Sequence, residues 1–365
     1  MSHPLCGADL KTLSTVFADA GSVAPGKRLK KYGIWAAAIG RTPLSTLEKA
    51  IFTSSLPTVE DIAPPIFVLG HWRSGTTHLY NTMVKADTFS YVDPIATGLP
   101  WDILGMARIL RPLLERTIPR DRYIDNIPVT ADAPQEDEIA LASMTPVSFY
   151  HAIYFPSKFH EHLNRGLFPD EWTEEERCSR ENAFRHFMLK LSYRDKKQLL
   201  IKNPVYTGCP DFIRSVFPNA KFIHIHRNPF EVFLSMRNFY QKLLPVFALQ
   251  PYEHLDIEDI VLQTYSKMMH RFEQETAGLK APDFVEIGYE ELSNNPLGSL
   301  EKIYSDLQLD GFSSAKPAFE NYLGSVSGYR KNVFKGTPDM AQKVQIQCAH
   351  FIEKWAYQMP EIASP

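Results

Sequence analysis

A short polar loop between two apolar segments is the first place in the chain where the residue types suggest chemistry. The stretch "PPIFVLGHWRSGTTHLYNTM" runs from Pro64 to Met83, and its pattern predicts a strand, a turn and the start of a helix. Unpaired N–H groups and the positive end of the helix dipole favour an anion at such a helix N-terminus. The loop residues that we predict to bind this anion are Arg73, Ser74, Gly75, Thr76 and Thr77.

This loop differs from the phosphate-binding loop of nucleotide triphosphatases. That loop follows the pattern G-x-x-x-x-G-K-[ST], and its lysine reaches the β- and γ-phosphates. Here the first glycine and the lysine are absent, and Arg73 supplies the cation instead. The spacing therefore indicates an anionic group smaller than a triphosphate.

A second polar cluster follows another strand-like run, in "FIHIHRNPFEVFLSMRNFY". Arg227 ends the predicted strand, and Ser235 lies two turns into the predicted helix. An arginine at a strand end and a serine on the facing helix surface can hold one phosphate together. Two such clusters on neighbouring strands predict a ligand with two separated phosphate groups.

Two histidines raise the question of a metal site. His224 and His226 alternate along one predicted strand, so both point to the same face of the sheet. A metal site would need a third ligand, and the nearby sequence supplies none at a recognised spacing. We therefore predict packed or hydrogen-bonded histidines and no metal.

Alternating strands and helices must position these clusters. Apolar runs predict strands at 66–69 and in "QLLIKNP", "AKFIHIHR" and "DFVEIG", and this alternation predicts an α/β fold with a central parallel sheet covered by helices on both faces. Ligands of such sheets bind at the carboxyl ends of the strands, where both clusters lie. Helices are predicted at 76–85, 208–216, 230–244, 257–276, 296–307 and 340–358.

We divide the chain into an N-terminal helical segment, residues 1–63, and a main domain, residues 64–365. We expect the N-terminal segment to pack on the main domain. The main domain contains a helical insert at 90–195. Within the insert, "WDILGMARILRPLLERTI" at 101–118 predicts a basic amphipathic helix that is kinked at Pro112.

The composition limits the class of protein. The 365 residues are 44% hydrophobic and 22% charged, with a net charge of -3, which indicates a globular protein without a global basic field for nucleic acid. The four cysteines lack metal-binding spacing, and no apolar run approaches the length of a membrane span. Because the N-terminus has no secretory signal pattern, we predict a cytoplasmic location.

The motifs taken together resemble a known family. "FVLGHWRSGTTHL", "LLIKNP", "AKFIHIHRNPFEVFLSM" and "VEIGYEELSNNP" occur in the order seen in sulfotransferases that use 3′-phosphoadenosine 5′-phosphosulfate (PAPS). The resemblance covers 64–357 and is greater to the single-domain bacterial-type branch than to the animal cytosolic aryl enzymes, which carry a lysine where Arg73 stands. It implies a P-loop NTPase-like sulfotransferase fold with a P-loop-like strand-loop-helix, and PAPS as co-substrate without a metal.

The resemblance also implies a role for each cluster. The first loop would hold the 5′ end of PAPS, and Arg227 and Ser235 would hold the 3′ phosphate. Tyr289 is similar in position to a family aromatic residue near the adenine. The later stretch "SVSGYRKNVFKG" resembles a basic loop that closes over the 3′ phosphate, with a free solvated loop as the alternative. The candidates in this loop are Tyr329, Arg330 and Lys331.

Sulfuryl transfer requires cations and, for a hydroxyl acceptor, a general base. Arg73 would stabilise charge on the bridging and sulfuryl oxygens, and Lys202, at the end of "LLIK", would add a second cation. The predicted base is Asp93, near where related enzymes carry a catalytic glutamate, or Glu136, in "APQEDEIAL". Either acid could instead serve as a helix cap or a surface charge. His78 is a third option.

The acceptor is expected to bind between the insert 90–195 and the N-terminal helices, where aromatic residues are frequent. A hydroxyl or amine of a lipid, a glycolipid, a carbohydrate or a small hydrophobic alcohol would suit this region. The basic-aromatic stretches 27–35 and 101–118 suggest peripheral membrane contact, with helices docked on their own domain as the alternative. Two rival functions are a kinase-like phosphoryl-transfer enzyme and a non-catalytic protein that binds a bisphosphate nucleotide. The oligomeric state stays open.

Overall fold

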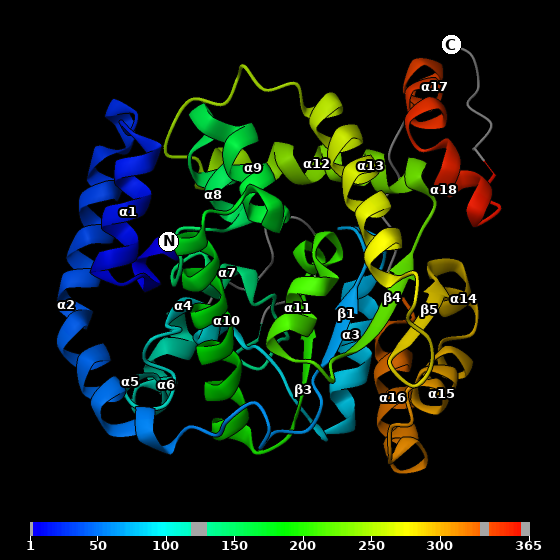
Figure 1. The fold of residues 1–365 in the computed structure, drawn as a ribbon, viewed down its shortest axis with the longest axis horizontal. Coiled ribbons are helices and arrows are strands. Elements are labelled where there is room, and N and C mark those ends of the chain that lie inside the picture. The colour runs from blue at the N-terminus through cyan, green and yellow to red at the C-terminus, as the bar shows by residue number, and fades with distance from the viewer. Residues whose placement is uncertain (1–2, 118–129, 329–335, 359–365) are drawn as a thin grey trace.

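A parallel β-sheet forms the centre of the molecule (Figure 1). The structure is a computed structural model that describes residues 3–117, 130–328 and 336–358. The strand order is β2-β3-β1-β4-β5 and each pairing is parallel, so the predicted α/β fold with a central parallel sheet is confirmed. The strands are β1 (Ile66–Leu69), β2 (Phe89–Ser90), β3 (Gln198–Lys202), β4 (Lys221–His226) and β5 (Phe284–Gly288).

Alternate side chains of β1 enter two hydrophobic cores. Phe67 and Leu69 pack into one core, and Ile66 and Val68 pack into the other, because successive strand residues point to opposite faces. Helices cover both faces of the sheet. The first core includes α10 (Glu174–Asp195), α11 (Pro210–Val216), α12 (Pro229–Phe247) and α13 (Ile257–Thr276), and the second includes α3 (Thr76–Met83), α15 (Pro296–Asp306) and α16 (Phe312–Val326).

The strand order places a topological switch point between β1 and β4. The chain leaves β1 towards β2 on one side of the sheet, and it leaves β4 towards β5 on the other side. Ligands of open parallel sheets bind outside the carboxyl ends of two such strands, where the direction of the connections reverses. The two predicted anion-binding clusters follow these two strands.

The region predicted as a basic helix at 101–118 does not form one helix. Its start is a series of turns, followed by α5 (Met106–Ile109), α6 (Arg111–Leu114) and a 3-10 turn at Glu115–Thr117. Pro112 lies in the first turn of α6, where its missing N–H costs nothing, so it begins a helix rather than bending one. Residue 118 lies outside the described residues.

Two further elements differ from the sequence-based expectation. The C-terminal helix predicted at 340–358 is two helices, α17 (Pro338–Gln347) and α18 (Ala349–Lys354), which are separated at Cys348. Strand β2 and helix α16 were not predicted. Two residues are too few to show a strand period, and Pro317 inside α16 weakens the helical pattern.

The N-terminal residues form helices α1 (Leu10–Ala20) and α2 (Arg28–Phe52). Ile34 and Ala38 of α2 are buried against the main core, and the ring of Trp35 lies 6.1 Å from that of Phe17. Within the described residues, no helix is both long enough and apolar enough to cross a membrane. The other helices that the site uses are α4 (Pro94–Gly98), α7 (Glu138–Leu141), α8 (Phe149–Tyr154), α9 (Phe159–Leu167) and α14 (Tyr289–Asn294).

Candidate active site

The loop between β1 and α3 has a backbone shape that ordinary residues seldom adopt. Gly70, Arg73 and Gly75 have positive φ values of 139°, 71° and 102°. A side chain at Gly75 would meet the ring of Tyr289 at 2.2 Å, so only glycine fits there. Positive φ at a residue such as arginine is uncommon and is found mostly at functional sites. Glycine allows this shape at two of the three positions, and at Arg73 the surrounding contacts must hold it.

The two anion-binding clusters are in direct contact. Arg73 Nε donates to Ser235 Oγ at 2.8 Å, and a guanidinium nitrogen of Arg227 donates to the Arg73 carbonyl at 3.1 Å. Arg73 was assigned from the sequence to one end of the ligand and Ser235 to the other. Their hydrogen bond shows that both clusters line one continuous surface above β1 and β4.

Tyr289 lies against both clusters. It is the first residue of α14, directly after β5, and its ring packs on Gly75 of the first loop. The guanidinium carbon of Arg227 lies 4.5 Å from the centre of the same ring, which is a cation–π geometry. Strands β1, β4 and β5 thus each end in one part of this surface.

Two buried donors on this surface have no partner among the described residues. They are Ser74 Oγ in the first loop and Arg227 Nε in the second cluster. A buried polar atom without a hydrogen bond is costly. A ligand that is rich in acceptor oxygens would satisfy both atoms.

A second charged group lies at the carboxyl end of β3. Lys202 Nζ lies 2.5 Å from Glu136 Oε1, and both side chains are largely buried. The pair joins two of the residues that the sequence predicts as catalytic. Removing either partner would leave the other group buried without its ion-pair partner, which is strongly destabilising.

Residues near Lys202 are also hydrogen-bonded to residues near Glu136. Asn203 Nδ2 donates to Glu138 Oε2 at 3.1 Å, and the Tyr206 hydroxyl donates to Asp137. Burial raises the pKa of the Asp137 carboxyl to about 7, which the bond from Tyr206 partly opposes. These contacts fix the segment before α7 against the end of β3.

Glu138 continues this buried network. Arg180 of α10 forms an ion pair with it at 2.6 Å, and Ser148 Oγ donates to it at 2.7 Å. The pKa of Arg180 is raised because Glu138 lies beside the guanidinium, although burial acts in the opposite direction. A buried charge that is paired in this way and hydrogen-bonded holds its surroundings in one arrangement.

Asp93, the other predicted base, is occupied by structural contacts. Its Oδ1 accepts from the N–H groups of Ile95 and Ala96 at 2.9 Å, so Asp93 is the N-cap of α4. Its Oδ2 forms an ion pair with Arg194 at 2.6 Å. One oxygen therefore caps the start of α4, and the other is paired with the half-buried Arg194.

The two histidines of β4 are packed and hydrogen-bonded, as predicted. His224 Nδ1 lies 2.8 Å from Glu286 Oε2, and its ring lies 4.0 Å from that of Phe272. His226 stacks on Trp355 with ring centres 4.3 Å apart. Within the described residues, no group of three or more histidine, cysteine or acidic side chains is arranged to hold a metal ion.

Comparison with known proteins decides the family. A family model described as "Sulfotransferase family" matches residues 64–314, which is more than half of the chain. The chain belongs to the sulfotransferase family. The bacterial-type resemblance and the P-loop NTPase-like fold that it implied are thereby confirmed, and the protein is an enzyme of the transferase class.

Individual relatives agree with this result. The chain is 27% identical over 317 residues to the omega-hydroxy-beta-dihydromenaquinone-9 sulfotransferase Stf3 of Mycobacterium bovis and that of Mycobacterium tuberculosis, which covers 86% of this chain and 80% of each relative. Among solved structures, sulfotransferase STF9 of Mycobacterium avium has a TM-score of 0.74 at 16% identity, covering 96% of this chain and 93% of that chain. Sulfotransferase STF1 of Mycobacterium tuberculosis has a TM-score of 0.63 at 19% identity, covering 86% and 85%. These two structures share the fold.

The structure brings several of the predicted site residues together. Three groups meet around the carboxyl ends of the strands in this sulfotransferase: the first loop, the Arg227 cluster with Tyr289, and the Lys202–Glu136 pair. Tyr329, Arg330 and Lys331 lie outside the described residues. His78 is half-buried in the first turn of α3. Nucleotide binding by each of these residues stays a prediction.

Sequence reasoning missed the residues that support the site from beneath. Arg180, Arg194 and Tyr206 hold the acids of the 93–138 region in place. Each is distant in sequence from its partner, so no local pattern marks it. Asn203 was within the quoted motif "LLIKNP", and its position directly after Lys202 is a signal that could have identified it.

Proposed function

We propose that this sulfotransferase transfers the sulfuryl group of PAPS to a hydroxyl of a lipid-type acceptor and releases adenosine 3′,5′-bisphosphate. The observation that carries the proposal is the contact between the two anion-binding clusters, through Arg73, Ser235 and Arg227. One continuous cationic surface suits a ligand that has phosphate groups at two ends. The unpartnered donors Ser74 Oγ and Arg227 Nε support the same ligand.

In this proposal the first loop holds the 5′ end of PAPS. The hydroxyls of Ser74, Thr76 and Thr77, with the backbone N–H groups at the start of α3, bind the phosphosulfate oxygens. Arg73 stabilises the charge that develops on the oxygen bridging phosphorus and sulfur. Its bond to Ser235 restrains the guanidinium before the ligand arrives, so less ordering is needed during the reaction.

The second cluster holds the nucleoside end. Arg227 and Ser235 bind the 3′ phosphate, and Tyr289 lies beside the adenine. The stacking of Arg227 on Tyr289 keeps the guanidinium plane in one orientation. We also assign Tyr329, Arg330 and Lys331 to the 3′ phosphate, on the strength of the family resemblance alone.

Glu136 is the proposed general base and Lys202 its partner. A sulfur–oxygen bond forms to the acceptor hydroxyl while the bond to the phosphate oxygen breaks, and the hydroxyl proton passes to the Glu136 carboxylate. Lys202 holds this carboxylate at 2.5 Å and adds a cation near the transferred group. Asp93 is less suited to the role of base because its oxygens cap α4 and pair with Arg194.

The acceptor assignment rests on the relatives and on the composition of the insert. The curated relatives carry the name of a dihydromenaquinone sulfotransferase, and that compound is a lipid. In this chain the insert contributes many buried aromatic residues, including Phe149, Tyr150 and Tyr154 of α8. We place the enzyme in the cytoplasm, at the membrane surface, because none of its four cysteines is paired and a lipid acceptor resides in the bilayer.

The test uses purified protein, PAPS labelled with radioactive sulfur, and an extract that is separated into lipids, polymers and small molecules. We expect label in the lipid fraction, and an about 10²-fold to 10³-fold lower rate for Arg73→Ala. Label in the polymer or small-molecule fraction would refute the lipid acceptor but would still support sulfuryl transfer as the reaction. Tight binding of adenosine 3′,5′-bisphosphate without label in any fraction would refute transfer and indicate a binding protein.

A further inference from the structure

Helix α2 is oriented in the opposite way to most helices on a protein surface. Surface helices normally direct their apolar stripe to the core and their charged residues to water. Here several charged and polar side chains of α2 point inward, and large aliphatic side chains point outward. The inward side chains are Arg41, Ser45 and Glu48, and the exposed large apolar residues are Leu29, Tyr32, Ile39, Leu44, Leu47 and Ile51.

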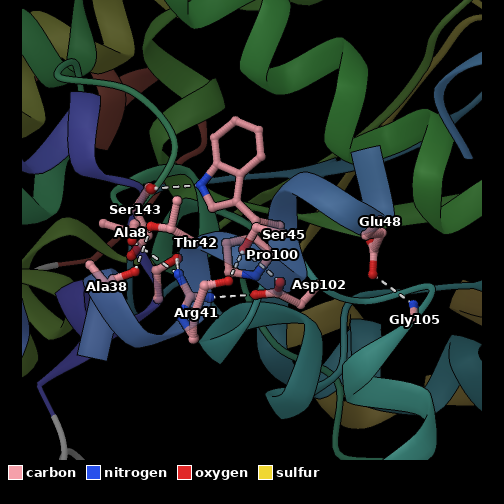
Figure 2. A network of polar contacts seen from close by, with 12 residues as sticks. Ala8, Ala38, Arg41, Thr42, Ser45, Glu48, Pro100, Asp102, Gly105 and Ser143 are labelled. Carbon is pink, nitrogen blue, oxygen red and sulfur yellow. Dashed lines mark hydrogen bonds and ion pairs between the residues drawn. The ribbon is translucent and has the colours of Figure 1, made fainter. Parts of the chain in front are cut away.

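The inward side chains are fixed by a dense set of contacts (Figure 2). Arg41 forms an ion pair with Asp102 at 2.5 Å, and Ser45 Oγ donates to the same carboxylate at 2.6 Å. Glu48 accepts from the Gly105 N–H at 2.6 Å and pairs with Lys190 of α10 at 2.5 Å. Because these buried charges would lose their partners if α2 rotated, the apolar face cannot turn inward.

The outward face is apolar along the whole helix. At 100° per residue, the exposed aliphatic residues share one side of α2 with Gly33, Ala36, Gly40, Pro43 and Ala50, which are exposed as well. From Leu29 to Ile51 this side extends about 33 Å at 1.5 Å per residue. Leu29 is 86% exposed, Tyr32 64% and Ile39 59%. Contiguous exposed apolar patches of this size mark sites that bind another apolar surface.

The charges that border this face are cationic. Glu48 is the only acid in α2 and it is buried, whereas Arg28 and Lys49 are exposed. An apolar helix face with basic residues along its border is the pattern of helices that lie in the plane of an anionic membrane surface.

We infer that the outward face of α2 docks this enzyme on an anionic lipid bilayer. The surface shares Leu29 and Tyr32 with the stretch 27–35 suggested by the sequence, and it continues along α2 to Ile51. Ile34 and Trp35 of that stretch pack on the enzyme itself, and Lys31 lies over the Phe17 ring at 5.1 Å. The purpose of this docking rests on the proposed lipid acceptor. The evidence for the docking surface is the orientation of α2 and the residues along its outward face.

Binding to vesicles tests the inference without any catalytic step. The protein is sedimented with vesicles of phosphatidylcholine and phosphatidylglycerol in equal parts, and with vesicles of phosphatidylcholine alone, in the absence of PAPS and acceptor. We expect wild-type protein to bind the anionic vesicles. Ile39→Glu is expected to lower the bound-to-free ratio about tenfold or more, since it replaces an aliphatic side chain that would be buried in the bilayer by a charged one.

Ile346→Glu is the matched control. Ile346 is 71% exposed on α17, which lies at the opposite end of the molecule from α2 (Figure 1). The substitution is the same and the site is also an exposed helix position, so we expect vesicle binding equal to wild type. A second variant, Leu47→Glu, repeats the test at the other half of α2. Thermal unfolding identifies any variant that fails to fold.

Two outcomes would overturn the inference. One is equal vesicle binding by wild type, Ile39→Glu and Leu47→Glu. The other is a wild-type dimer in sedimentation equilibrium that Ile39→Glu converts to a monomer, without vesicle binding, because the face then covers a second copy of the chain. Sulfuryl transfer is assayed separately on detergent-dissolved lipid, so failure to dock and failure to transfer are distinguished.

Discussion

Lys202 Nζ lies 2.5 Å from Glu136 Oε1, at the point where β3 ends. The contact joins the end of a central strand to the segment before α7. Two residues that follow Lys202 connect the same two segments, since Asn203 binds Glu138 and Tyr206 binds Asp137. Glu136 is therefore held in one position beside the end of β3. The same contact brings together the two residues that we propose as the base and the second cation.

Glu136→Gln tests the proposed base. We expect turnover to fall about 10²-fold or more, because an amide cannot accept the acceptor proton. The affinity for adenosine 3′,5′-bisphosphate, measured by calorimetry, should stay within about twofold because Glu136 is not assigned to the nucleotide. Turnover that is unchanged in Glu136→Gln would exclude this carboxylate as the base.

Substitutions of Asp93 test whether this residue has a structural or a catalytic role. Asp93→Ala removes the cap of α4 and the partner of Arg194, so we expect the free energy of unfolding to fall by roughly 2–4 kcal/mol. Asp93→Asn keeps a capping oxygen and should lose less stability. Turnover per folded molecule, measured for both variants below their melting range, should remain close to wild type. A 10²-fold loss in Asp93→Asn would instead identify Asp93 as the base.

Arg227 is expected to govern nucleotide affinity. Arg227→Ala should weaken the binding of adenosine 3′,5′-bisphosphate by about 1.5–3 kcal/mol, as measured by calorimetry, because it removes a charged hydrogen-bond donor. Arg227→Lys should recover only part of this loss, since lysine cannot stack its planar group on Tyr289 or donate a paired hydrogen bond. Unchanged affinity in Arg227→Ala would show that the second cluster has another role.

Gly75 tests the closeness of the first loop to Tyr289. A β-carbon at Gly75 would meet the Tyr289 ring at 2.2 Å, and φ of 102° is unfavourable for alanine. Gly75→Ala should therefore displace the ring or the loop, and weaken bisphosphate binding at least about tenfold. Gly324→Ala is the control, because no atom lies within 4 Å of a β-carbon there and its helix accepts alanine. Equal affinities in the two variants would contradict the described loop shape.

The contrast between local and distant contacts explains what could be predicted from the sequence. Strands β1 and β4 with their polar loops were predicted because strand, turn and helix are adjacent in the chain. The bond between Arg73 and Ser235 was not, because it depends on β1 lying next to β4. Lys202 and Glu136 were proposed separately, and only the folded chain shows that they form a pair.

The surface elements show a second limit of prediction from the sequence. The stretch 101–118 has helical spacing, but one helix ends at Leu110 and a second begins with Pro112 in its first turn, because proline favours a helix start over a helix interior. In α2, the spacing of apolar residues predicts a helix and cannot tell which side faces the protein. That side is decided by the partners of Arg41 and Glu48, which are distant in the sequence.

The buried carboxyl of Asp137 predicts how stability changes with pH. Burial raises its pKa in the folded state from an ordinary value of 3.8 to about 7. Between these two values the folded state keeps a proton that the unfolded state has lost. The free energy of unfolding should therefore fall as pH rises from about 4 to about 7, by on the order of 1.4 kcal/mol per pH unit from this group. Below this window the contribution is fully present, and above it the contribution is lost.

Asp137→Asn isolates this contribution, because asparagine has no proton to lose and can still accept the hydrogen bond from Tyr206. Urea unfolding at several pH values should show wild type losing stability relative to the variant as pH rises through the window. Asp310→Asn, at an exposed aspartate, is the matched control, and its difference from wild type should not vary with pH. Parallel pH profiles for wild type and Asp137→Asn would mean that Asp137 is ionised in the folded protein. The network around Glu138 and Arg180 would then hold one more buried negative charge, which Tyr206, Arg180 and Asn203 would have to stabilise.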